Sequence, residues 1–160
     1  WGEWSATSAG GYDFSAAKLD ENGSLLWAWQ EGSEQDDVMY ASAAMDDGGM
    51  LVAGYFNGTW HGETSHGDLD FAAAKLSSAG TVIWRWQDGT TYADVLRACV
   101  QTTDSNVVVA GYSQGSMTDI ENDGYNDIVA VKLDVDIGYT IWVYQVGTEG
   151  SGGVYAKAAA

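Results

Sequence analysis

The chain has 160 residues, the size of one ordinary domain, and 46% of them are hydrophobic. This apolar content, with 12% aromatic residues, excludes a disordered chain despite 21 glycines. The formal charge of −17 disfavours binding to nucleic acid or to anionic membrane surfaces, and no apolar run reaches the roughly 20 residues of a membrane span.

The first predicted elements form a hairpin. Residues 13–20 make one strand and residues 24–30, rich in aromatic and branched side chains, make the next. Glu21-Asn22-Gly23 is a turn between them, because Asn-Gly readily adopts positive φ.

Two further strands follow at residues 38–45 and 50–56. A polar stretch, 32–37, precedes them, and Asp46-Asp47-Gly48-Gly49 provides the turn between them. A longer loop, residues 57–69, then leads to the next group of strands.

These elements repeat with a period of 57 residues. Asp13–Leu19 recurs as Asp70–Leu76 and Asp127–Leu133, and two other segments recur likewise: Leu26–Gln30 as Ile83–Gln87 and, displaced by one residue, Ile141–Gln145; Leu51–Tyr55 as Val108–Tyr112. Three aligned blocks at one period indicate tandem repeats of a four-stranded unit.

The sequence therefore predicts an all-β fold of consecutive four-stranded antiparallel blades of a β-propeller. About two and three-quarter repeats of 57 residues are present: residues 1–12 as the end of a preceding blade, 13–69 as repeat 1, 70–126 as repeat 2 and 127–160 as incomplete repeat 3. Closed propellers need about four to eight blades, so we expect a fragment of a larger propeller. An open β-solenoid is the structural alternative.

The Asp-Phe…Lys-Leu-Asp…Gly…Trp run, the turn at Asp37 and Asp94, and the Val-Ala-Gly-Tyr strand resemble a tandem beta-propeller repeat family. That family occurs in secreted and surface proteins, and most of its functions are unassigned. The resemblance covers nearly the whole chain and implies the fold, not an activity.

One loop has the composition of a calcium site. Residues 119–127 alternate carboxylates, then place Gly124 before a final acid, an order that can wrap oxygens around Ca²⁺. It resembles the calcium loops of integrin-type propeller repeats. That resemblance implies side-chain ligands from Asp119, Glu121, Asp123 and Asp127 and a carbonyl ligand from Tyr125, although Glu121 stands where Asp or Asn is usual. The competing interpretation is a solvated acidic loop.

Other repeated residues indicate structural roles. The paired tryptophans, Trp27 with Trp29 and Trp84 with Trp86, share a face by strand alternation and are expected to fill the space between blades. The lysine at one repeat position, Lys18, Lys75 or Lys132, is expected in an ion pair with Asp37 or Asp94. Cys99 is expected to be a small buried thiol, not a nucleophile.

No residue pattern indicates a catalytic centre, so we expect no enzymatic activity from this chain. The sequons at Asn22 and Asn57 are candidate glycosylation sites and favour an extracellular or cell-surface location. His61 and His66, in one loop with Glu63, supply too few ligands for a zinc site.

The leading functional hypothesis is a structural, assembly or adhesion module, whose partners are proteins or further blades. One alternative is a propeller that binds carbohydrate or protein, with Trp60 and Tyr125 as exposed aromatics. The other is a fragment of a propeller enzyme with its catalytic residues outside this chain.

Overall fold

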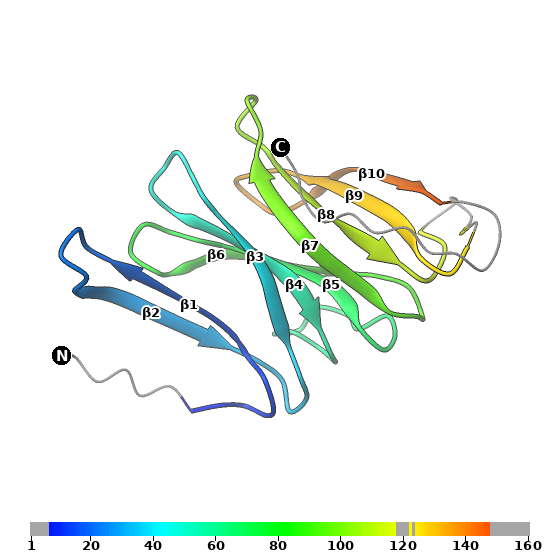
Figure 1. The fold of residues 1–160 in the computed structure, drawn as a ribbon, viewed down its shortest axis with the longest axis horizontal. Coiled ribbons are helices and arrows are strands. Elements are labelled where there is room, and N and C mark those ends of the chain that lie inside the picture. Colours follow the sequence, from blue (N-terminus) through cyan, green and yellow to red (C-terminus); the bar gives the residue numbers. More distant parts are fainter. Residues whose placement is uncertain (1–6, 118–121, 123, 148–160) are drawn as a thin grey trace.

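The computed structural model describes residues 7–117, 122 and 124–147, and its described part consists of strands and connecting loops (Figure 1). No helix in this part is long and apolar enough to cross a membrane. The strands are β1 (Phe14–Leu19), β2 (Leu25–Glu31), β3 (Val38–Ala44), β4 (Met50–Phe56), β5 (Asp70–Leu76), β6 (Val82–Asp88), β7 (Asp94–Gln101), β8 (Val107–Ser113), β9 (Asp127–Leu133) and β10 (Thr140–Val146).

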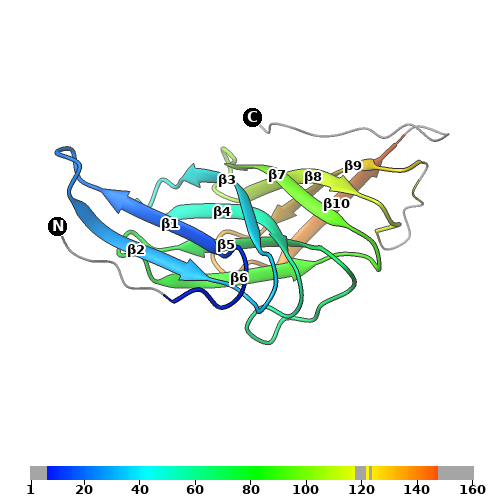
Figure 2. The same cartoon turned by 60° about the horizontal axis from the view of Figure 1, so that its bottom comes forward.

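These strands form three antiparallel sheets, which confirms the all-β prediction. One sheet contains β1 and β2, the next follows the order β3-β4-β5-β6, and the last follows β7-β8-β9-β10. Figures 1 and 2 show the three sheets following one another along the molecule, each twisted relative to its neighbour. The described sheets do not close into a ring, so the structure shows antiparallel sheets and not a propeller.

The grouping of the four strands of one sequence repeat into one sheet was wrong. Each four-stranded sheet takes two strands from one repeat and two from the next, because the loop 57–69 returns the chain from β4 to pair with β5. The shorter connection, residues 32–37, carries the chain to a new sheet. The period itself is unchanged, since Val38 and Val95 hold equivalent places in β3 and β7.

The middle sheet, β3–β6, is covered on both faces, and its side chains alternate between two cores. In β5, Ala72, Ala74 and Leu76 pack with Phe14 and other residues of the first core, towards β1 and β2. Phe71 and Ala73 point to the opposite face and join the second core, against the sheet β7–β10. Every residue of β5 is buried, as expected for a strand between two layers.

The tryptophans of β2 and β6 occupy the spaces between sheets, as predicted. Trp84 and Trp86 are 6% and 7% exposed and lie in the second core. Trp29 lies in the first core, with Trp27 packed against it. Ala72 and Ala74 of β5 share the first core with Trp29 and leave room for its ring.

The repeated lysines bind the β3–β4 and β7–β8 turns. These turns lie at the opposite end of the sheets from Asp37 and Asp94, the predicted partners. Lys75 Nζ is 2.8 Å from Asp47 Oδ2, and Lys132 pairs in the same way with Asp104, 2.5 Å away. Lys18 donates to the carbonyl of Gly48 at 3.0 Å. The prediction of Asp37 or Asp94 was wrong because the lysines lie near the far ends of β1, β5 and β9, towards the β-turns.

Cys99 lies partly buried against the second core, with Sγ 4.0 Å from the Leu51 carbonyl oxygen. Burial raises the pKa of its thiol to about 12.

Because the thiolate is the reactive form, we expect Cys99 to react with iodoacetamide at pH 8 at least tenfold more slowly in the folded chain than in the chain unfolded in urea. Mass spectrometry of the alkylated protein measures both rates. Equal rates would contradict the assignment of Cys99 as a structural thiol.

Candidate functional site

Three of the five ligands of the predicted calcium loop, Asp119, Glu121 and Asp123, lie outside the described residues. Of its other proposed ligands, Tyr125 is exposed and Asp127 is fully buried at the start of β9. The Oδ2 atom of Asp127 accepts a hydrogen bond from Gln145 Nε2 at 2.9 Å. Asp127 therefore has a structural duty within its sheet, whatever the loop binds.

This Asp–Gln pair recurs in every repeat. Asp70 Oδ2 accepts from Gln87 Nε2 at 2.7 Å, and Asp13 Oδ2 accepts from Gln30 Nε2 at 2.5 Å. Asp70 also accepts from the backbone N–H of His66, at 2.9 Å. The carboxylate thus joins the first strand of a hairpin to the second and to the loop that precedes it.

The glutamines of the second and third pairs, Gln87 and Gln145, also hold the loops after β4 and β8. Gln87 Oε1 accepts from the Trp60 N–H at 2.9 Å, while its Nε2 also donates to the Gly58 carbonyl at 2.6 Å. In the next sheet, Gln145 makes the equivalent bonds to Met117 N–H and to the Gly115 carbonyl, both at 2.9 Å. Buried groups of this kind must be hydrogen-bonded, so the network fixes both loops to the sheets.

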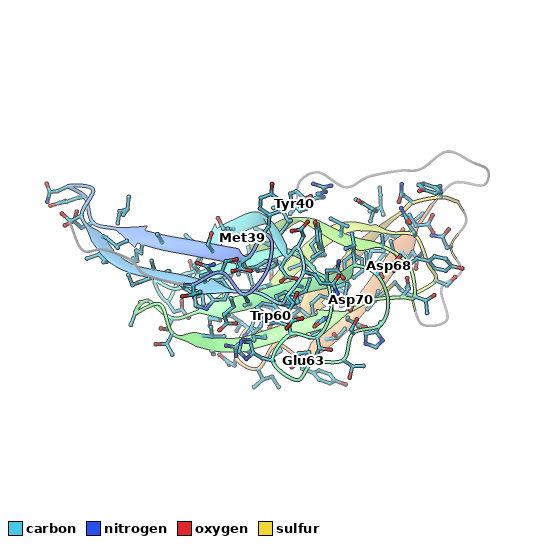
Figure 3. All side chains as sticks on the ribbon, turned by 90° about the horizontal axis from the view of Figure 1, so that it is seen from below. Met39, Tyr40, Trp60, Glu63, Asp68 and Asp70 are labelled. Atoms are coloured by element: carbon cyan, nitrogen blue, oxygen red, sulfur yellow. The ribbon has the colours of Figure 1, made fainter. Side chains whose placement is uncertain are left out.

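Trp60 is not available for ligand stacking. It is 1% exposed, stacks on Phe56 with ring centroids 4.8 Å apart, and donates through Nε1 to Glu31 Oε2 at 3.0 Å. Its predicted exposure was wrong, because the Gln87 network turns the loop inward. Figure 3 shows Trp60 and Asp70 within the body of the molecule, while Glu63 lies at its periphery.

Glu31 links two sheets through a charged contact. Burial alone would raise its pKa, but the hydrogen bond and the charge of Arg85 on β6 outweigh that effect and lower the pKa. Arg85 Nε donates to Glu31 Oε2 at 2.7 Å. His61 lies 3.5 Å from the same oxygen, and His66 lies 3.8 Å from Asp88. The two histidines therefore face different acids and do not converge.

The two sequons lie in turns, as predicted. Asn22 is exposed between β1 and β2, next to Gly23 with its φ of 80°. Asn57 follows β4 directly and is half-buried, with its backbone N–H donating to Asp37 Oδ1 at 2.8 Å. Asn22 is the more accessible of the two.

A tryptophan lock joins consecutive sheets. Trp27 Nε1 donates to the Ser78 carbonyl in the β5–β6 turn, and Trp84 Nε1 donates to the Val135 carbonyl in the β9–β10 turn, both at 2.9 Å. Each ring lies against a turn glycine. A Cβ on Gly80 would come within 2.6 Å of Trp27, so the lock requires glycine there.

The corresponding residues on the outer face of β10 are exposed. Trp142 stands where Trp84 stands one repeat earlier and is 42% exposed, and Tyr144, in the place of Trp86, is 56% exposed. On the outer face of β1, Leu19 is 56% exposed, whereas Leu76 at the same repeat position is fully buried. The outer face of β10 thus carries the aromatic side of the contact between sheets, and the outer face of β1 carries the leucine side. Between the inner sheets both sides are buried against each other.

No group of three or more His, Cys, Asp or Glu side chains within the described ranges converges as a metal site. No protein-family model matches the chain, and no curated protein matches it.

Replacing Trp84 with Ala should destabilise the chain by about 3–5 kcal/mol, because the ring fills the second core. The same change at Trp142 should cost less than about 1 kcal/mol in the isolated chain, since its ring is partly solvated. Urea unfolding of both variants measures the difference. Equal losses would contradict the assignment of Trp142 to an open face.

Desolvation by burial raises the pKa of Asp94 to about 6. A carboxyl whose pKa is higher when folded stabilises the fold fully only below its unfolded pKa, near 4, and that stability is lost as pH rises through about 6. In calcium-free buffer, wild type should therefore gain stability relative to Asp94→Asn as pH falls from 7 to 4.5. Urea unfolding at both pH values tests this, and a pH-independent difference would contradict it.

Proposed function

We propose that the chain is a non-enzymatic structural and assembly module of the propeller type, in which successive sheets stack through the tryptophan lock. The repeated bond of Trp27 and Trp84 to the next turn carries this proposal, together with the exposed Trp142 at the same position. The apolar face of β10 is then covered by a further sheet of the same repeat type.

The two outer faces carry the two different sides of the contact between sheets, which supports head-to-tail stacking. One face presents Trp142 and Tyr144, and the other presents Leu19, whose equivalents Leu76 and Leu133 are buried against the preceding sheet. A head-to-tail contact of this kind extends until the ring closes or a cap ends it. Further repeats of the same protein supply the covering sheets most simply, because they preserve the turn glycine and carbonyl that the lock needs.

The apolar character of these faces also argues for assembly. Trp142, Tyr144 and Val146, which alternate along one face of β10, are each more than 40% exposed, and an apolar face in water favours association. The proposed location is extracellular or at the cell surface, with the sequon at Asn22 as its supporting feature.

The natural protein should have a mass well above 17.0 kDa after enzymatic removal of N-glycans, or should form oligomers of this chain. Intact mass spectrometry combined with light scattering measures both, and a mass shift on deglycosylation tests the extracellular location. Acrylamide should quench Trp142 less in the natural protein than in the 160-residue chain. A 17.0 kDa monomer with an accessible Trp142 would contradict stacking.

A further inference from the structure

Two fully buried carboxylates face each other where the middle sheet meets the sheet β7–β10. Asp70 begins β5, Asp94 begins β7, and both side chains are 0% exposed. A methyl group placed on Gly89 would lie 2.9 Å from Asp70 Oδ1 and 2.8 Å from Asp94 Oδ2. The two groups therefore converge on the backbone of Gly89, where a side chain would not fit.

Each carboxylate keeps one oxygen without a hydrogen-bond donor. The Oδ2 atom of Asp94 accepts from Thr90 N–H at 2.5 Å, and that of Asp70 accepts from Gln87, but the Oδ1 atoms of both are buried and unpartnered. None of the ion pairs among the described residues involves either acid. Two buried negative charges without a compensating cation are unfavourable.

The equivalent pair in the preceding repeat, Asp13 with Asp37, differs at the second acid. Asp37 uses both oxygens, accepting from Ser33 N–H at 2.5 Å and from Asn57 N–H at 2.8 Å. One period later Gln114 replaces Asn57, and its N–H bonds to the Ala93 carbonyl instead, at 3.1 Å. Asp94 Oδ1 is left without that donor.

A second difference makes the space beside Asp94 more polar. Phe56, fully buried in the first core, is replaced one period later by Ser113, which lies directly opposite Asp94 in the β7–β8 pairing. The Ser113 hydroxyl contacts the Gly115 carbonyl at 3.0 Å and also interacts with the Asp94 carboxyl, whose pKa burial raises and this interaction lowers. An apolar ring has thus been exchanged for a smaller, oxygen-bearing side chain.

We propose that Asp70 and Asp94 bind a small hard cation, Ca²⁺ in preference to Mg²⁺. Carboxylate and hydroxyl oxygens are the ligands that Ca²⁺ takes, and its flexible geometry suits donors that come from two separate sheets better than the strict octahedron of Mg²⁺ does. Thr90 Oγ1, 3.0 Å from Asp94 Oδ2, adds a third oxygen. None of these ligands belongs to the acidic loop 119–127, and the site is independent of the proposed stacking.

A cavity of about 410 Å³ lies beside these residues and is lined by His66, Gly89, Thr90, Thr91, Tyr92 and Ser116. Gly89 and Thr90 also contact the two acids, so the fully buried carboxylates lie behind this part of the cavity wall.

The test begins with the 160-residue chain stripped of metal by a chelator at pH 7.5. Calcium chloride at about 100 times its Kd should raise Tm by roughly 5–10 °C, because only the folded chain assembles the site. Magnesium chloride at the same concentration should raise it much less. Isothermal titration calorimetry gives the stoichiometry and the Kd.

Single and double variants test which residues bind calcium. Asp94→Asn should lose most of the Tm response to calcium, while Asp37→Asn, the matched control in the preceding repeat, should keep it. The double variant Asp119→Asn with Asp123→Asn should also keep it, and this control serves if Asp94→Asn does not fold. The inference is overturned if Asp94→Asn responds like wild type or if the acidic-loop variant alone abolishes the response. It is also overturned if calcium has no effect and lower pH alone stabilises wild type, since the pair would then share a proton.

Discussion

A sheet that is covered on both faces must carry small or apolar side chains at successive positions, and β5 does so from Phe71 to Ala74. Ala72 and Ala74 on one side leave room for Trp29, and Ala73 on the other side lies beside Trp86 of the neighbouring strand β6. Two cores therefore share one strand, and disturbing that strand weakens both. The position of the neighbouring sheets, and of every site between them, follows from this packing.

The polar groups at the ends of the strands limit how such sheets can stack. Each new sheet must bury the start of a strand, and there the chain uses an Asp–Gln pair to satisfy loop groups that would otherwise lose their water. The tryptophan lock satisfies a polar group in the same way, since the indole N–H that enters the interface donates to a turn carbonyl. Trp29 shows the alternative. Its Nε1 atom makes no such bond across the interface, because Val82 stands where Thr140 accepts from Trp86 in the next interface, and it interacts with Glu31 of its own strand instead.

The strands, their turns and the interior tryptophans were predictable because alternation and the 57-residue period are local properties of the sequence. The assignment of strands to sheets was not, because pairing depends on which connection changes sheets, and loop length favoured the wrong one. The inward turn of Trp60 was missed for a similar reason. It depends on Gln87, 27 residues away, and the only available signal was the recurrence of glutamine at 30, 87 and 145.

Repeats allow structural and specific roles to be separated within one chain. A residue that persists in every unit, such as the Asp of the Asp–Gln pair, is explained by the fold that all units share. A residue that changes in one unit needs an explanation local to that unit. The replacement of Phe56 by Ser113 removes apolar burial and brings a hydroxyl to Asp94, which lacks the backbone donor that Asn57 supplies to Asp37. The proposed cation would act on the same residues, because the buried carboxylates and the added hydroxyl oxygen would all become its ligands.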